Sequence, residues 1–395
     1  MRGGLLLRWW VPYASLHEAR TQCCVRSPPG AAGEASTSRR RRALPSLRGM
    51  THENPPFAIA VEAGSEGVSP QRIRAAIAAL ERFGVTIATF EDTGFRDLRA
   101  TAPRLDAIEQ AAFAAPLSGA TGLVPLIRVS AVEPFHLATQ LATLDYASHG
   151  RAGWIGDVDG SEVEAAAFDR PPLEGPEARR TELDDTIEVL GRLWDSWEDD
   201  AVIRDVETGR YLDRDKLHYA DFEGARFSVK GPSIIPRPHQ GQLLTFAPYG
   251  SATPELVDVA LIRERTVLEA SAAAGQADSQ GIARTIVEVS VALDAPGRPA
   301  ADRAGAFAAD TQAAGRIHYS GDAAGLVELI TEVASFANGV RLLPADFGVD
   351  VQELGRAVLP ALRRAGVFTS PRAGEHLRDA LGLAHPVNRY AAQAL

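Results

Sequence analysis

The chain has 395 residues, of which 45% are hydrophobic and 23% charged, a composition typical of a globular protein with a sizeable core. Its formal net charge is −10; because residues 1–50 hold nine arginines against two glutamates, a net of +7, the remainder carries −17. This acidic balance argues against nucleic acids and anionic membrane surfaces as partners. No apolar run approaches the roughly 20 residues that a membrane-spanning helix requires.

Residues 1–50 form a basic leader that precedes the first core-like pattern. The leader contains the run Arg39–Arg42, and acidic residues are rare in it. Organellar targeting peptides, electrostatic arms for phosphate-bearing partners and an extension upstream of a start at Met50 all share this composition. The only two cysteines, Cys23 and Cys24, lie here, so residues 51–395 have no disulfide and no cysteine nucleophile or metal ligand. We expect a disordered leader and a cytoplasmic protein.

From Phe57 onward, apolar runs alternate with segments of helical period. We expect strands at residues 57–61, 85–90, 122–129, 151–155, 243–247, 287–293 and 339–343. We expect helices at residues 69–84, 105–115, 135–148, 326–336 and 351–365. The strands are apolar throughout rather than alternating, which is typical of a parallel sheet covered on both faces.

About eight strand–helix units fit residues 57–370 and favour an α/β fold of the (β/α)8 TIM-barrel class. An open doubly wound sheet is the alternative, but no GxGxxG fingerprint follows the expected strands. Two inserts interrupt this alternation of strands and helices, at residues 156–176 and 201–240. The first predicts a long loop after a strand, and turn signals in the second predict a small hairpin subdomain. Because long loops at the carboxyl ends of barrel strands build active sites, we expect both inserts near one.

The turn at Gly250 and Ser251 is a candidate anion site. Pro254 is expected to open a helix, and the N–H groups of Gly250 and Ser251 just before it could bind a phosphate. A plain N-capped helix without a ligand explains the same residues, so the spacing leaves both interpretations open.

Several separate sequence blocks within residues 51–395 are similar to those of one known family. They are Leu141–Asp145, Gly150–Trp154, Leu193–Ala201, Gly209–Asp213, Phe227–Pro232 and Val358–Gly366. In this order they resemble the bacterial luciferase-like flavin-dependent monooxygenases, in the branch that holds nitrilotriacetate monooxygenase and dibenzothiophene-sulfone monooxygenase. The resemblance implies a luciferase-like (β/α)8 barrel over residues 51–395.

The resemblance also implies an FMN-dependent monooxygenase of the two-component type. Such enzymes take reduced FMN from a separate flavin reductase and use O2 to oxygenate a small organic substrate, and they are commonly homo-oligomers. Because the cofactor carries the hard chemistry, no catalytic triad is expected, and the catalytic residues stay unknown. An F420-dependent oxidoreductase is a lesser alternative.

The resemblance assigns five residues to the flavin site. Asp92 lies beside the flavin at the end of the second strand, and Gly250 and Ser251 stand in the phosphate turn. Val158 and Asp159 stand where the family carries polar and hydroxyl side chains that hold the flavin. An anionic Asp159 about 4 Å from a flavin phosphate would repel it by roughly 1–4 kcal/mol.

A second departure from the family is Thr181, which follows Arg180 and replaces a tyrosine that contacts the flavin. Together with Asp159 and the altered phosphate turn, it supports a second hypothesis: a luciferase-like barrel that has lost flavin chemistry and serves as a binding or assembly partner.

The remaining candidate residues are expected to be structural. No histidine stands at metal-ligand spacing from Glu198–Asp200, so no metal site is expected. Arg151 is expected to form a buried ion pair with Asp145. The histidines interpreted as structural are His136, His149, His218 and His239.

Overall fold

The computed structural model describes residues 56–63, 69–91, 105–303 and 315–391. The basic leader and Asp92 lie outside the described residues, so the predictions made for them are not tested by the fold.

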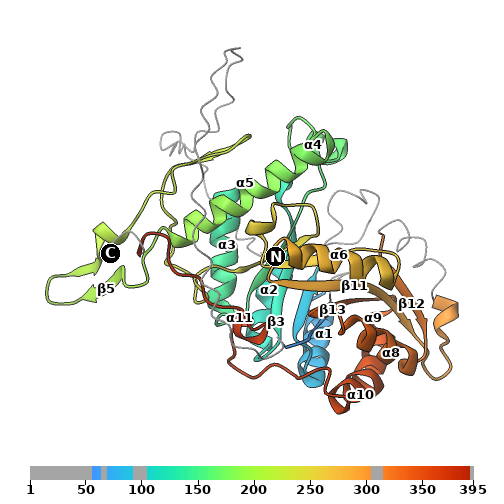
Figure 1. Cartoon of the computed structure of the whole chain (residues 1–395). Coiled ribbons are helices and arrows are strands. Elements are labelled where there is room, and N and C mark those ends of the chain that lie inside the picture. The colour runs from blue at the N-terminus through green and yellow to red at the C-terminus, as the bar shows by residue number, and fades with distance from the viewer. Residues whose placement is uncertain (1–55, 64–68, 92–104, 304–314, 392–395) are drawn as a thin grey trace, which may run out of the picture.

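A closed barrel of parallel strands forms the body of the protein (Figure 1). In order around the barrel, the strands are β1 (Ala58–Glu62), β2 (Ile87–Phe90), β3 (Gly122–Arg128), β4 (Gly153–Asp157), β9 (Leu244–Pro248), β10 (Val259–Ile262), β11 (Arg284–Leu293) and β13 (Gly339–Pro344). The barrel closes because β13 pairs with both β1 and β11, while β11 also pairs with β10. The predicted (β/α)8 barrel is confirmed.

One further strand, β12 (Ile317–Gly321), pairs with the second half of β11 outside the closed ring. Strands β12 and β10 were not predicted from the sequence. Helix α6 (Val267–Ser279), between β10 and β11, was not predicted either.

Helices surround the barrel (Figure 1). They are α1 (Pro70–Phe83), α2 (Ala107–Ala114), α3 (Pro134–Ala147), α4 (Glu162–Ala167), α5 (Gly175–Asp195), α6, α8 (Ala323–Val333), α9 (Phe347–Glu353), α10 (Leu359–Arg364) and α11 (Leu377–Ala380). Their ends follow local chemistry: the Ser69 side chain caps α1, and Gly84 ends it at a φ of 66°. A π-helical turn at Leu354–Val358 joins α9 to α10, so the helix predicted at 351–365 is nearly continuous. Among the described residues, no helix is both long and apolar enough to cross a membrane.

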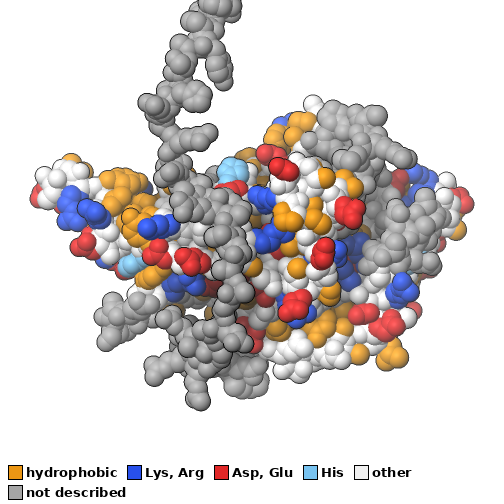
Figure 2. Space-filling view, turned by 90° about the horizontal axis from the view of Figure 1, so that it is seen from above, with side chains coloured by type: hydrophobic (Ala, Val, Ile, Leu, Met, Phe, Trp, Pro, Cys, Tyr) orange, Lys and Arg blue, Asp and Glu red, His pale blue; other side chains and the backbone are white. Residues whose placement is uncertain are grey.

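The insert at residues 201–240 contains two short antiparallel pairs. Strands β5 (Val202–Asp205) and β6 (Arg210–Leu212) form one pair, and β7 (Phe222–Glu223) and β8 (Ser228–Val229) form the other. The predicted hairpin subdomain is therefore confirmed, and it protrudes from the barrel in Figure 1. Figure 2 shows the same protrusion, with acidic and basic side chains interspersed on the face in view.

Two local predictions need correction. The insert at residues 156–176 is not purely a loop, because Ser161 caps the short helix α4 within it. The helix predicted from Pro254 is only a 3₁₀ turn, Pro254–Leu256. The chain becomes extended at Val257 and enters β10 at Val259, which leaves no length for a helix.

Apolar side chains fill the amino-terminal half of the barrel interior. They recur at every second residue of the strands, as expected for inward-facing positions. The cluster consists of Ala58, Ala60, Ile87, Val124, Leu126, Ile155, Leu244, Phe246, Val259, Leu261 and Ile286, joined by Leu377 and Leu381 of α11. Helix α11 therefore closes the amino-terminal end of the barrel, which leaves the carboxyl end for the site.

Candidate active site

Charged side chains continue the inward-facing positions at the carboxyl end of the barrel. On β1, Glu62 follows Ala58 and Ala60 at the two-residue period, and on β11, Glu288 follows Ile286. The same step places Asp157 on β4, Arg341 on β13, Glu91 just after β2 and Arg263 just after β10. With Arg316, these residues form a group that we call the mouth network: Glu62, Glu91, Asp157, Arg263, Glu288, Arg316 and Arg341.

Arg341 is the centre of the mouth network and is fully buried. One of its terminal nitrogens, Nη1, donates to Glu288 Oε1 at 2.6 Å, and the other, Nη2, donates to Glu62 Oε2 at 2.8 Å and to Glu91 Oε1 at 2.5 Å. Its Nε donates to Thr89 Oγ1 at 3.0 Å. Burial alone would lower the pKa of Arg341, but Glu91, Glu288 and Glu62 raise it above its ordinary value. The arginine is therefore held charged inside the barrel.

Glu288 accepts hydrogen bonds from three arginines. Besides Arg341, Arg263 Nε donates to Glu288 Oε2 at 2.9 Å and Arg316 Nε donates to the same oxygen at 2.5 Å. Burial alone would raise the pKa of Glu288, but Arg263, Arg341 and Arg316 lower it well below its ordinary value. Arg263 also lies 3.9 Å from Asp157 Oδ2, so the network reaches β4. The result is a rigid polar wall that offers fixed donors and acceptors.

The phosphate turn predicted at Gly250 and Ser251 follows β9. Gly250 has a φ of 82°, and a Cβ added to it would meet nothing within 4 Å, so there is open space beside this turn. Ser251 donates to Pro248 O from both its backbone N, at 3.0 Å, and its Oγ, at 2.7 Å. Since the expected helix is absent, no helix dipole favours an anion here. Positive charge comes instead from Arg180 of α5, whose Nη2 donates to Gly250 O at 2.9 Å.

Helix α5 brings the predicted flavin blocks together. Asp184, one turn beyond Arg180, accepts from Thr253 N at 2.8 Å and Thr253 Oγ1 at 2.6 Å, which fixes the turn after β9 against the helix. On the other side, a Cβ added to Gly160 would lie 3.2 Å from Arg179 Nε, so the loop after β4 is also beside α5. Arg179 and Arg180 are both exposed. The sequence analysis weighed Arg180 only as part of a family motif.

Val158 and Asp159 lie in this loop, immediately after β4, and both are half-buried. Val158 packs against the main core cluster. Both residues therefore lie at the carboxyl end of the barrel, near the α5 arginines. Asp92, the fifth predicted flavin residue, lies outside the described residues.

A small hollow adjoins the loop after β4. Its lining includes Ser130, Gly160, Glu164, Arg170 and Arg226. Ser130 Oγ donates to Glu164 Oε2 at 2.6 Å, whereas Glu164 Oε1 is buried and has no hydrogen-bond partner among the described residues. Arg170 Nη1 is bound to Ser130 O at 3.1 Å. The space inside the hollow is close to that of one water molecule, so the hollow is not large enough for an organic substrate.

The remaining sequence predictions concern structural residues. The predicted ion pair between Arg151 and Asp145 is wrong. Arg151 Nη1 donates instead to Ser118 Oγ at 2.6 Å and to Thr121 O at 2.9 Å, because Arg151 precedes β4 and points to the loop before β3. Asp145 instead accepts from Gln240 Nε2 at 2.7 Å.

The histidines of the insert make contacts within the subdomain and its neighbours. His218 Nε2 lies 2.7 Å from Glu198 Oε1, and its ring stacks on Tyr390 with centroids 4.0 Å apart. His239 packs edge-on against Tyr146 with centroids 4.7 Å apart. These contacts are those of packing residues.

Residues 54–319 match the family model described as luciferase-like monooxygenase. The N-acetyl-S-(2-succino)cysteine monooxygenase of Bacillus subtilis (strain 168) is 39% identical over 130 residues, which are 32% of this chain and 29% of that protein. Dibenzothiophene-sulfone monooxygenase of Rhodococcus erythropolis is 34% identical over 139 residues, 34% of this chain and 31% of that protein. The matched segments thus span less than a third of these two relatives.

Other matches extend further along the chain. One component of the pristinamycin IIA synthase of Streptomyces pristinaespiralis is 29% identical over 233 residues, 58% of this chain and 72% of that protein. The crystal structure of a long-chain alkane monooxygenase superimposes with a TM-score of 0.72 and 15% identity, covering 87% of this chain and 100% of the other. At that identity, the structural likeness shows the barrel fold alone.

Proposed function

Because the chain belongs to the luciferase-like monooxygenase family, we propose that it is an FMN-dependent monooxygenase of the two-component type. A separate flavin reductase supplies reduced FMN, and the enzyme uses O2 to oxygenate a small organic substrate. The observation that carries the proposal is the meeting of the loop after β4, Arg180 and the Gly250–Ser251 turn at the carboxyl end of the barrel.

The phosphate of FMN fits the α5 side of this end. Open space lies beside Gly250, and Arg180 uses one nitrogen on Gly250 O, which leaves its other guanidinium N–H groups for an anion. Arg179 adds a second positive charge near Gly160. Two arginines oppose the repulsion from Asp159, and charge-assisted hydrogen bonds to phosphate are among the stronger ones in proteins.

The ring system of FMN fits the mouth network. Its polar edge needs both donors and acceptors, and the network supplies them from residues that are already fixed by mutual pairing. When bound, reduced FMN supplies the electrons that activate O2. The residues of this chain orient the ring, hold the phosphate and exclude water from the reacting edge.

A luciferase-like barrel without flavin chemistry is the second candidate function. The observation that favours it is that the charged side chains of the mouth network are already bound to one another inside the barrel, with Asp159 close by on the β4 side. In that case the chain would bind a ligand or an active homologue.

A titration separates the two candidates. The purified chain is titrated anaerobically with reduced FMN, and separately with oxidised FMN and with F420, by fluorescence. Binding of reduced FMN at about micromolar Kd supports the proposal, and none up to about 1 mM supports the second candidate. Tighter binding of F420 than of FMN would instead favour the F420-dependent oxidoreductase. Reductase-dependent O2 uptake with candidate substrates then tests oxygenation.

We further propose that the enzyme works in the cytoplasm, where a reductase can supply reduced flavin, and that it assembles as a homo-oligomer. The absence of cysteine from residues 51–395 suits a reducing compartment. Light scattering on the purified chain measures the assembly state, and a monomer at all concentrations would contradict the second part.

A further inference from the structure

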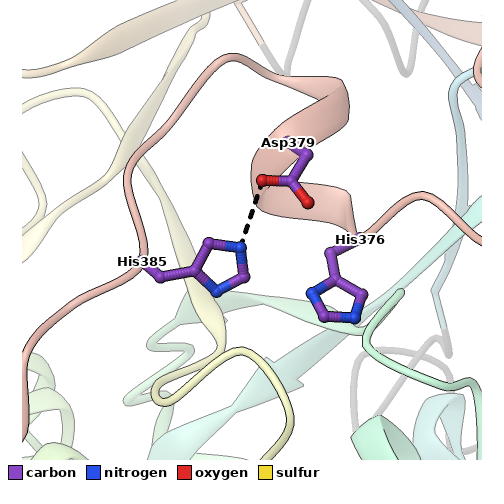
Figure 3. A group of neighbouring side chains, drawn as sticks. All are labelled: His376, Asp379 and His385. Carbon is purple, nitrogen blue, oxygen red and sulfur yellow. Dashed lines mark hydrogen bonds and ion pairs between the residues drawn. The ribbon is translucent and has the colours of Figure 1, made fainter.

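The amino-terminal end of the barrel holds a cluster that the proposed function does not use. Helix α11 lies against this end, and Leu377 N donates to Gly150 O at 2.9 Å. His376 immediately precedes α11, and Asp379 lies on the helix. His385 lies on the extended segment that follows. Figure 3 shows the three side chains His376, Asp379 and His385 directed toward one another.

Each residue of this cluster offers one ligand atom, and these atoms all lie within 4.8 Å of one another. His385 Nε2 is 3.1 Å from Asp379 Oδ1, and the two imidazole centroids are 5.3 Å apart. Tetrahedral Zn²⁺ with ligands at about 2.0–2.1 Å places its ligand atoms about 3.3 Å apart. The longest separation must therefore shrink by somewhat more than 1 Å, which rotation of the exposed side chains of Asp379 and His385 can supply.

The backbone that carries these ligands is fixed on both sides. On the α11 side, Arg378 Nε donates to Gln242 O at 3.0 Å and Arg284 Nε donates to Leu381 O at 2.8 Å. On the other side, Arg237 Nη2 donates to Pro386 O at 3.0 Å, next to His385. The ligands therefore approach one another from two anchored segments. Binding of an ion would thus cost little conformational entropy of the chain.

Space for the His376 ring depends on Gly150. A Cβ at Gly150 would lie 2.5 Å from His376 Cδ2, and Gly150 has a φ of 79°. The ring thus packs directly on the backbone of the turn before β4, which limits its movement.

We propose that His376, Asp379 and His385 bind a divalent transition-metal ion, with water at the remaining positions. Two imidazoles and one carboxylate suit Zn²⁺, Co²⁺ or Ni²⁺, whereas Mg²⁺ and Ca²⁺ prefer sets made of oxygen alone. The ion joins α11 to the segment after it and so holds the helix that closes the barrel floor. This site lies at the opposite end from the mouth network and does not depend on flavin binding.

The test uses the full chain, freed of metal with EDTA and dialysed. Calorimetric titration with ZnCl2 should show binding at about micromolar Kd, and the melting temperature should rise by about 3 °C or more at saturating Zn²⁺. His385→Gln and Asp379→Asn change exposed side chains and should each weaken Zn²⁺ binding about tenfold or more. CoCl2 should give a visible absorption band that the double variant His376→Ala/His385→Gln lacks.

Two controls make the result specific. His136→Ala removes an exposed histidine of α3 and should leave Zn²⁺ affinity unchanged. His17, Cys23 and Cys24 of the leader have side chains of the types that bind Zn²⁺. Binding that survives His385→Gln and Asp379→Asn unchanged therefore belongs elsewhere and overturns the proposal. Failure to bind Zn²⁺ or Co²⁺ up to about 1 mM overturns it as well. Melting in EDTA shows whether each variant is folded.

Discussion

At the carboxyl end of the barrel, Arg341 and Glu288 are buried and paired with other charges, whereas at the amino-terminal end Leu377 and Leu381 fill the same interior with apolar side chains. The same strands contribute to both ends, and the apolar and the charged inward-facing residues of one strand often lie within three residues of each other. The apolar end needs only burial to be stable. The charged end is stable only while its ions stay paired. A buried ion that loses its partner is also cut off from the water that would otherwise solvate its charge.

This difference separates stability from function within one barrel. Buried ion pairs are weak contributors to stability when compared with apolar packing of the same volume. Their presence in the mouth, rather than at the floor, therefore points to a polar environment kept for a ligand. The floor, including α11, serves to hold the strands in place.

The largest expected effect comes from breaking the mouth network. Arg341→Met should lower the free energy of unfolding by about 3–5 kcal/mol, because Glu62, Glu91 and Glu288 lose their shared partner inside the barrel. Urea unfolding at pH 7 measures the loss. Adding Glu91→Gln should recover part of it, because the ion pair of Glu91 in the network is with Arg341.

An exposed ion pair provides the control for that experiment. The side chain of Arg210 is 57% exposed and that of Asp213, its partner, is 30% exposed, so Arg210→Met should cost less than about 1 kcal/mol. Equal losses for Arg341→Met and Arg210→Met would show that burial of the network contributes nothing.

A smaller loss is expected at the floor. Leu377→Ala should lower the free energy of unfolding by about 3 kcal/mol through the cavity that it leaves beneath the barrel. The affinity for reduced FMN should not change, because the proposed flavin site lies at the other end. The matched control is Leu268→Ala, whose side chain is largely exposed and should change stability by less than about 0.5 kcal/mol. A loss of flavin affinity in the folded variant would contradict the separation of the two ends.

Acid should act on the mouth and not on the floor. The pKa values of Glu288 and Glu91 lie below the ordinary 4.5 in the folded state, so the unfolded state binds more protons as the pH falls. The stabilisation is complete above pH 4.5 and is lost below it, by about 1.4 kcal/mol per pH unit for each carboxylate. Urea midpoints at pH 6, 5, 4 and 3 measure this slope. Glu288→Gln should make it shallower, whereas Leu377→Ala should leave it unchanged.

The same contrast explains how much the sequence could predict. Apolar strands such as Ala58–Glu62 were found because buried parallel strands are recognisable as continuous hydrophobic runs. Strand β12 was missed because its residues Ile317–Gly321 include His, Tyr and Ser, and only half of it resembles a core strand. The ion pair between Arg341 and Glu62 joins residues 279 apart, and no local spacing reveals such a partner.

The candidate site follows the same rule. The spacing of Gly250 and Ser251 before Pro254 fitted both an anion site and a plain N-capped helix, and the helix expected after them was wrong because β10 begins too soon. The contact of Arg180 with Gly250 needed the coordinates. A charged residue at an inward-facing position, such as Glu288 within an apolar strand, was the one local signal that could have indicated the mouth network.

Flavin binding should respond to the α5 arginine more than stability does. Arg180→Ala should weaken reduced FMN binding about tenfold, or about 1.4 kcal/mol, through the loss of a charge-assisted contact to phosphate. Unfolding should change by less than about 0.5 kcal/mol because Arg180 is exposed. Arg214→Ala in the hairpin subdomain is the matched control and should not alter affinity. An unchanged affinity for Arg180→Ala would show that the phosphate does not bind at the turn after β9.

The smallest expected effect is a gain. Asp159 follows β4 near the α5 arginines, and in the proposed site its negative charge would oppose the phosphate of FMN. Asp159→Ser introduces a neutral hydroxyl and should tighten reduced FMN binding about fivefold, equivalent to about 1 kcal/mol, with a somewhat larger gain at low salt because the charge of half-buried Asp159 is partly screened by ions. Asp215→Ser, in the hairpin subdomain, controls for the general loss of one negative charge. If Asp159→Ser weakens binding instead, Asp159 contacts the flavin through a favourable hydrogen bond, and the phosphate must lie further from the loop after β4 than proposed.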